Sequence, residues 1–126
     1  MQISSRDRVN SFVTLDGSTI RELAGPAWTA ARRQSLAEAI VPAGSQTLEH
    51  RHLETEEIYY FVGGRGRMRL GDEESGVAAG DCVVIPPGTA HKLWAAPDGD
   101  LVLLCACAPA YSDRDTEMIT RSGGGS

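Results

Sequence analysis

Residues 44–64 read GSQTLEHRHLETEEIYYFVGG, and residues 80–95 read GDCVVIPPGTAHKLWA. In both stretches short apolar runs are bounded by glycine or proline turns, which is typical of β-strands. All three histidines of the chain, His50, His52 and His91, lie within them. The two stretches therefore predict a β-fold and also the place of its chemistry.

The same pattern of short strands and turns extends on either side. We expect strands at residues 18–23, 35–41, 47–52, 57–62, 67–70, 82–85, 92–95 and 101–106. Short strands about ten residues apart, with no connection long enough for repeated crossover helices, indicate an all-β antiparallel sandwich or barrel. Residues 25–33 fit either one helical turn or a loop.

The length and composition limit the class of protein. The 126 residues correspond to about 0.8 of a typical domain, so we expect a single domain over residues 1–120. The last six residues, RSGGGS at 121–126, resemble a linker and are expected to lie outside the fold. Hydrophobic residues at 41% and charged residues at 23% suit a soluble globular protein.

Charge and cysteine content predict the partners and the compartment. Twelve basic against seventeen acidic residues give a net charge of −5, which disfavours binding to nucleic acid. No apolar run reaches the roughly 18 residues of a membrane span, and the polar N-terminus lacks the apolar core of a secretion signal. Three cysteines are too few, and odd in number, for a disulfide framework. A reducing, cytoplasmic setting is therefore expected.

The histidine spacing favours a metal site. His50 and His52 are two residues apart on an expected strand, so their side chains point to the same face. Glu57 has the wrong parity for a straight strand, but the polar residues 53–56 can turn and bring Glu57 back opposite the histidines. The turn at 86–90 sets where His91 begins the next strand. Three imidazoles and one carboxylate suit a divalent ion of iron, manganese, nickel, cobalt, copper or zinc, and are too rich in nitrogen for calcium or magnesium.

These residues resemble the first signature motif of the cupins. That motif is a glycine, five residues, His-x-His, three or four residues, a glutamate, six residues and a glycine. Here it reads Gly44, His50, His52, Glu57 and Gly64.

The second cupin motif follows fifteen residues later. It is a glycine, five residues, Pro-x-Gly, two residues, a histidine, three residues and an asparagine. Here it reads Gly80, Pro86, Gly88 and His91, with Ala95 in place of the asparagine. Because that asparagine is not a metal ligand in the family, the departure concerns the polarity of the barrel lumen.

The resemblance implies a cupin jelly-roll β-barrel, an antiparallel double-stranded β-helix like that of short bacterial cupins. It also implies one divalent transition-metal ion in the lumen, held by His50, His52, Glu57 and His91. Many relatives are dimers. A homodimer is expected here too, because residues 58–62 are apolar on both faces and need cover on both.

Two assignments near this motif have alternatives. A turn one residue shorter would replace Glu57 with Glu56, and parity alone does not decide; the six-residue step to Gly64 favours Glu57. Cys105 and Cys107 share a strand face and could form a soft-metal or redox pair. We favour small core hydrophobes for both, and for Cys82.

Two residues are candidate catalytic groups. Tyr59 lies on the lumen side if Glu57 does, where its hydroxyl could orient a substrate or its ring could fill the barrel. Gln46 shares the parity of His50 and is expected to contact the lumen. An apolar pocket is expected from the remaining residues on the lumen side, which are Phe61, Met68, Leu93 and Ala95.

Arg65, Arg67 and Arg69 alternate along one strand. We interpret them as a solvent-facing basic row; a row that recognises anions would require the arginine face, instead of the Met68 face, to point inward.

The expected function is that of a metal-dependent enzyme. Its substrate would be a small, polar, metal-chelating metabolite, and its reaction oxygenation, decarboxylation, isomerisation or lyase chemistry. The alternative is a non-catalytic cupin that acts as a small-ligand binding or sensor module, although the 126 residues include no DNA-binding domain to transmit a signal.

Overall fold

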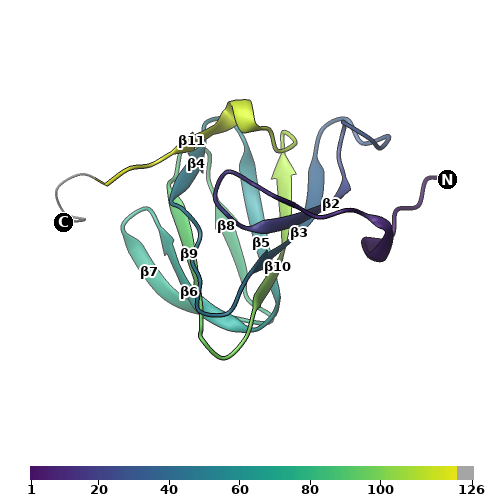
Figure 1. The fold of residues 1–126 in the computed structure, drawn as a ribbon. Coiled ribbons are helices and arrows are strands. Elements are labelled where there is room, and N and C mark those ends of the chain that lie inside the picture. Colours follow the sequence, from purple (N-terminus) through teal and green to yellow (C-terminus); the bar gives the residue numbers. More distant parts are fainter. Residues whose placement is uncertain (122–126) are drawn as a thin grey trace.

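Two antiparallel β-sheets make up the fold, as Figure 1 shows. The structure is a computed structural model that describes residues 1–121. The strands are β1 (Phe12–Val13), β2 (Thr19–Ala24), β3 (Ser35–Val41), β4 (His50–His52), β5 (Glu56–Gly63), β6 (Arg65–Leu70), β7 (Glu73–Ala78), β8 (Cys82–Ile85), β9 (His91–Ala95), β10 (Leu101–Ala108) and β11 (Thr116–Met118). Within residues 1–121 the helical elements are two short 3-10 turns, η1 (Arg6–Arg8) and η2 (Asp113–Asp115). None of the described helices is long and apolar enough to span a bilayer.

The first three strands lie in one sheet, and from β3 onward the chain passes back and forth between the two sheets, except that β6 and β7 are neighbours in the same sheet. One sheet has the order β1-β2-β3-β10-β5-β8, and the other has the order β11-β4-β9-β6-β7. The long strands β3, β10 and β5 form the centre of the first sheet, with Cys105 paired to Ala37 on one side and to Tyr59 on the other. In the second sheet, β4 pairs with β9 at His50 and His91. The histidines therefore lie on one sheet and Glu57 lies on the other.

The core lies between the two sheets because alternate side chains of each strand point inward. Residues of β10 are buried at every second position. Phe61, Leu101 and Leu103 from the first sheet are fully buried, and they belong to the same core cluster as Met68 and Leu93 from the second. This packing closes the lower part of the interior and leaves the histidine end for a cavity.

Gly64 lies where the chain passes from β5 to β6, and so from one sheet to the other. Its φ is +77°, a conformation that favours glycine. A Cβ at this position would lie 2.0 Å from the backbone oxygen of Asp100. Both the backbone conformation and the close approach therefore require glycine at this point.

Most expected strands are present, and residues 35–41 form a strand with the predicted bounds. Strand β7 was not expected, because its sequence, EESGVA, lacks an apolar alternation. The two-residue β1 and the three-residue β11 were also missed. Residues 25–33 contain one turn, closed by the bond from the Thr29 amide to the Gly25 carbonyl, and then bends, so they combine the two alternatives.

The C-terminal expectation needs a partial correction. Arg121 was placed in the linker-like tail, but its guanidinium contacts both carboxylate oxygens of the buried Glu49, at 2.6 and 2.7 Å. The rest of the expected tail, 122–126, lies outside the described residues.

Candidate metal centre

The three histidines converge in the interior. On β4, His50 and His52 are buried while Arg51 between them is not, as their spacing predicts. His91 is the first residue of β9 and lies opposite His50 in the register. One ring nitrogen from each histidine lies within 4.8 Å of those of the other two, a cluster that could hold a metal ion.

Glu57 reaches this cluster from the opposite sheet. Its Oε1 lies 3.2 Å from Nε2 of His52 and 3.4 Å from Nε2 of His91. Glu57 is buried, whereas Glu56 is exposed. The choice of Glu57 over Glu56 therefore agrees with the structure, and β5 supplies the carboxylate across the interior.

The backbone and a threonine orient the rings. Nδ1 of His50 lies 3.1 Å from the carbonyl oxygen of Leu48, and Nδ1 of His91 lies 3.0 Å from that of Thr89. A carbonyl oxygen only accepts, so each Nδ1 carries the proton and donates it. This leaves Nε2 of each ring with its lone pair free for a metal.

His52 is oriented by the C-terminal strand. Its Nδ1 lies 3.1 Å from Oγ1 of Thr116, and that hydroxyl donates its proton to the carbonyl of Ser112 at 2.9 Å. The Thr116 oxygen must then accept from His52. The third imidazole is thus held in the same tautomer as the other two.

Two buried polar atoms at the centre have no hydrogen-bond partner among the described residues: Oε1 of Glu57 and Nε2 of His91. Burial alone raises the pKa of Glu57, but the nearby His52 and His91 imidazoles outweigh burial and lower it to about 2. Burial, followed by the charge of His91, lowers the pKa of His50. A buried carboxylate oxygen and an imidazole nitrogen that face each other without a partner leave a place for a cation, either a shared proton or a metal ion. The donor set of three nitrogens and one oxygen fits a divalent transition metal.

The second oxygen of Glu57 has a cysteine partner. The thiol of Cys107 donates to Oε2 of Glu57 at 3.3 Å, and the two residues are cross-strand partners in the β5–β10 register. Burial raises the pKa of the Cys107 thiol, which keeps it protonated as a donor. Cys105 is also buried, and both cysteines are free thiols. The expectation that both are buried is confirmed, but Cys107 contacts the site as well.

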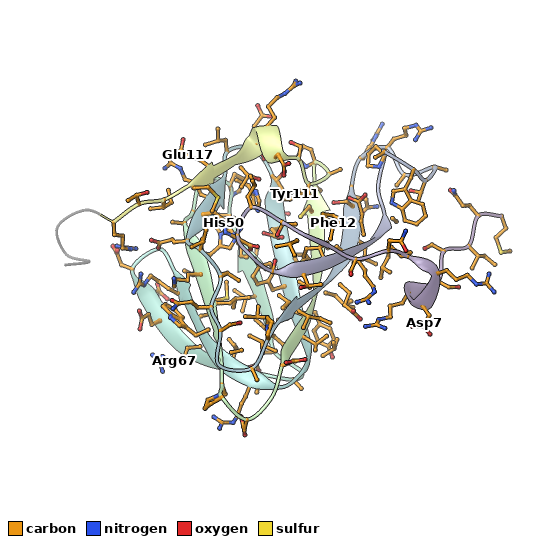
Figure 2. The ribbon with its side chains drawn as sticks, viewed as in Figure 1. Asp7, Phe12, His50, Arg67, Tyr111 and Glu117 are labelled. Atoms are coloured by element: carbon orange, nitrogen blue, oxygen red, sulfur yellow. The ribbon has the colours of Figure 1, made fainter. Side chains whose placement is uncertain are left out.

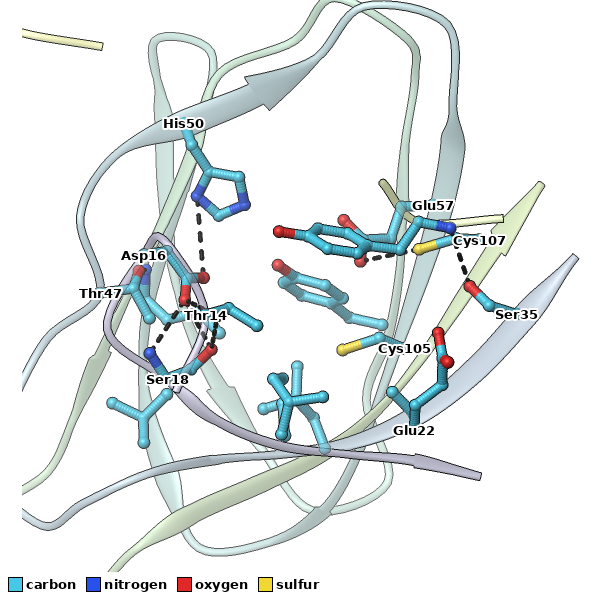
Figure 3. A pocket seen from close by; sticks show the side chains of 18 of the residues that line it. Thr14, Asp16, Ser18, Glu22, Ser35, Thr47, His50, Glu57, Cys105 and Cys107 are labelled. Atoms are coloured by element: carbon cyan, nitrogen blue, oxygen red, sulfur yellow. Dashed lines mark hydrogen bonds and ion pairs between the residues drawn. The ribbon is translucent and has the colours of Figure 1, made fainter. Parts of the chain in front are cut away.

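A cavity opens beside the cluster, as Figure 3 shows. Its volume is about 60 Å³, or about 610 Å³ when the crevices of its wall and its open mouth are included. Tyr59 and Leu93 line it, as expected, and so does Tyr111, whose ring centroid lies 5.7 Å from that of His52. Burial raises the pKa of Tyr59, so its hydroxyl remains a hydrogen-bond donor. Phe61 packs in the core below, together with Met68 and Ala95.

The expectation that Gln46 contacts the lumen is wrong. Gln46 is exposed and forms an isolated bridge to Trp94, whereas Thr47 is buried and lines the cavity. Residues 47–49 precede β4 without belonging to it, so the strand parity of His50 does not extend back to residue 46.

Two further expectations concern the outer surface. Met68 is buried while Arg65 and Arg67 are exposed, so the arginine row faces solvent and the inward-facing alternative is wrong. Cys82 is exposed, which corrects its placement in the core.

Sequence reasoning missed the loop between β1 and β2. Asp16 in this loop lines the cavity, and its Oδ2 lies 3.8 Å from Nδ1 of His50 (Figure 3). Figure 2 shows how Phe12, His50 and Tyr111 gather at this end of the molecule. The Asp16-Gly17 pair indicates a turn, but nothing local places that turn over the histidines.

A two-sheet antiparallel fold with three imidazoles and a carboxylate at one interior cavity defines a jelly-roll protein with a histidine-rich centre. A family model described as Cupin domain matches residues 37–107, more than half of the chain. The chain belongs to the cupin family, as the two motifs predicted.

Two curated relatives match the sequence. The chain is 48% identical over 113 residues to Uncharacterized protein MJ1618 of Methanocaldococcus jannaschii, covering 90% of each chain. It is 32% identical over 81 residues to Uncharacterized protein SCO3923 of Streptomyces coelicolor, covering 64% of this chain and 75% of the relative.

Solved structures resemble the fold at low sequence identity. The polyketide cyclase RemF from Streptomyces resistomycificus has a TM-score of 0.81 at 22% identity, and the match covers 98% of this chain and 88% of RemF. The Streptomyces nucleoside dehydratase Pac13 has a TM-score of 0.77 at 18% identity, and the match covers 94% of this chain and 91% of Pac13. A predicted oxalate decarboxylase from Thermotoga maritima has a TM-score of 0.74 at 18% identity, and the match covers 86% of this chain and 99% of the decarboxylase. These likenesses support the fold alone.

Proposed function

We propose that this cupin is a metal-dependent enzyme that acts on a small, oxygen-rich metabolite. One divalent ion of iron, manganese, nickel, cobalt, copper or zinc would be held by His50, His52, Glu57 and His91. The observation that carries the proposal is the unpartnered pair of buried atoms, Oε1 of Glu57 and Nε2 of His91, beside two further oriented imidazoles. Without a cation, these atoms would be buried at a cost that natural cores avoid.

The chain supplies the surroundings for chemistry on a chelating ligand. A bound divalent ion supplies Lewis acidity, which polarises a carbonyl or stabilises an enolate, or redox chemistry if the ion is iron. Tyr59 lines the cavity and can donate a hydrogen bond to a substrate oxygen. The apolar wall, which includes Leu93 and Leu103, excludes water from a bound ligand. Decarboxylation, isomerisation and lyase reactions use such polarisation, whereas oxygenation would use the redox chemistry of iron.

Catalysis is favoured over a purely binding role by the cavity at the cluster. The imidazoles and Glu57 lie at the wall of a space that a small molecule can enter. Solved structures that share the fold include a nucleoside dehydratase and a polyketide cyclase, so the fold accommodates enzymes. We also keep the predictions of a reducing, cytoplasmic compartment and of no nucleic-acid partner.

Metal analysis tests the ligand set. Protein purified without oxygen is expected to contain about one transition-metal ion per chain by elemental analysis. His52→Ala and Glu57→Gln should lose most of that metal, because each removes one of four ligands. Glu49→Gln is the matched control, since Glu49 is also a buried carboxylate but pairs with Arg121 at the surface.

Full occupancy in His52→Ala would contradict the ligand assignment. Once metal is established, a thermal-shift screen of small carboxylates, sugars and enediols identifies ligands, and turnover of the best ligand separates an enzyme from a binding module. Binding without turnover in the metal-loaded protein would favour the binding module.

A further inference from the structure

The wall of the cavity carries acidic groups without basic ones. Three of the lining residues are acids, Asp16, Glu22 and Glu57, and within residues 1–121 no lysine or arginine lines the cavity. The other lining residues are apolar side chains, hydroxyl groups, histidines and two thiols. Any positive charge that contacts a ligand in this cavity would therefore come from the metal ion proposed at the histidine cluster.

Asp16 is fixed in place at the cavity. Its Oδ1 accepts hydrogen bonds from the Thr14 hydroxyl at 2.7 Å, the Ser18 hydroxyl at 2.6 Å and the Ser18 amide at 2.9 Å. The carbonyl of Asp16 also accepts a hydrogen bond from the amide of Leu48 at 2.8 Å, which connects the β1–β2 loop to the segment just before β4. The Asp16 side chain is 13% exposed, and Figure 3 shows it beside His50. The carboxylate is held by enough bonds that it cannot turn away from an entering ligand.

This charge pattern restricts what can bind. A divalent ion and the Glu57 carboxylate together leave one positive charge, which a chelating head group with one negative charge neutralises. A second negative group on the same ligand would face Asp16 and Glu22 in a cavity whose described lining includes no lysine or arginine. A neutral or cationic group would not meet that repulsion.

We infer that the cavity takes ligands with a single metal-chelating head and a neutral or cationic tail, and that Asp16 excludes ligands with a second anionic group such as extended dicarboxylates and phosphate esters. The inference rests on the proposed metal site and adds the substrate class. Asp16 is thereby a specificity-determining residue that lies outside both histidine motifs.

Three hydroxamates that differ only in the tail test this inference. Butyrohydroxamate has a neutral tail, β-alanine hydroxamate a cationic one, and succinic monohydroxamate an anionic one, while all three chelate through the same two oxygens. With zinc-loaded protein at constant pH, calorimetric titration should give at least tenfold weaker binding for the anionic tail than for the other two.

Asp16→Asn should reduce this difference at least threefold and leave butyrohydroxamate binding unchanged. Asparagine keeps the oxygen that accepts from Thr14 and Ser18, so the loop is retained. Glu74→Gln, on the outer surface, is the control.

The outcomes separate this inference from the proposed function. Equal binding of the three hydroxamates, or an unchanged preference in Asp16→Asn, overturns the inference while the metal site stands. Zinc-loaded protein that binds none of them also overturns it. Protein that retains none of the six candidate metals after dialysis overturns the proposed function, and the inference with it.

Discussion

At the scale of single residues, Cys107 determines how Glu57 presents its carboxylate. The thiol donates to Oε2, so Oε1 is the oxygen that faces His52 and His91. Hydrogen bonds of this kind, from groups behind a ligand, commonly change metal affinity by 10- to 100-fold. Sequence spacing could not reveal the contact, because the two residues are fifty positions apart and meet only through the pairing of β5 with β10.

Removing the thiol is expected to weaken metal binding. Cys107→Ala leaves Oε2 of Glu57 buried without a donor, so the affinity for Zn²⁺ or Co²⁺ should fall about tenfold in a competition titration with a chromogenic chelator. Cys107→Ser restores a donor and should recover most of that loss. Cys105→Ala is the matched control, because Cys105 lies on the same face of β10 and lines the same cavity. Equal loss in the alanine and serine variants would mean that packing, not the hydrogen bond, is responsible.

At the scale of elements, the glycine between β5 and β6 controls the change of sheet. Gly64→Ala places a side chain on a left-handed backbone and against the Asp100 carbonyl. We expect the free energy of unfolding to fall by about 2–3 kcal/mol, measured by urea denaturation. Gly99→Ala is the control, since a Cβ there meets nothing within 4 Å. A loss below 1 kcal/mol in Gly64→Ala would show that the turn adapts.

The outer face of the β5 sheet supports the prediction of a homodimer. Ile58, Tyr60 and Val62 are 38%, 45% and 45% exposed. In the register, Ile58 lies beside Val84 of β8 and Ala106 of β10, so apolar side chains continue across the sheet. We expect a second copy of the chain to cover this apolar surface.

A charge introduced into this apolar surface should dissociate the predicted homodimer into monomers. The unmodified protein is expected to have the mass of a dimer in light scattering, and Tyr60→Lys is expected to shift it to that of a monomer. Arg67→Glu, on the outer face of the other sheet, should leave the dimer intact. A monomer for the unmodified chain at micromolar concentration would contradict the prediction.

Strand alternation predicted which residues face inward in most of the continuous strands, with Cys82 of β8 as an exception. His50, His52, Tyr59 and Met68 are buried for this reason. It failed at Gln46, because the chain before β4 is irregular. It also gave no sign of β7, whose pairing with β6 carries mostly exposed side chains and little apolar alternation. Asp16 and Thr116 reach the site from segments near the two ends of the described chain, and that approach depends on tertiary packing.

At the scale of the whole molecule, acid should destabilise the metal-free protein. The folded state lowers the pKa of His50 below its usual 6.5, so below pH 6.5 the unfolded chain takes up a proton that the folded chain resists. Glu57 adds a second loss between pH 4.5 and about 2, its lowered value. After treatment with a chelator, the free energy of unfolding should therefore decrease steadily from pH 7.5 to pH 4. Maximum stability near pH 5 would contradict this.

Bound metal should raise the free energy of unfolding, whereas acid lowers it. At a free concentration about 1,000 times the dissociation constant, Zn²⁺ is expected to add about 4 kcal/mol to the unfolding free energy at pH 7.5. Part of this gain should disappear at pH 5, because protons compete for the imidazoles. Melting curves at the two pH values, with and without Zn²⁺, measure the difference. The same curves for His52→Ala should show little effect of Zn²⁺ at either pH.

The bond from His52 to Thr116 has a consequence for shortened chains. The four side chains of the centre have all been translated by residue 91, yet β10 and β11, which complete both sheets around them, come from residues 101–118. A chain truncated before Thr116 loses the partner of His52 Nδ1 and should therefore bind metal more weakly, even though all four proposed ligands are present.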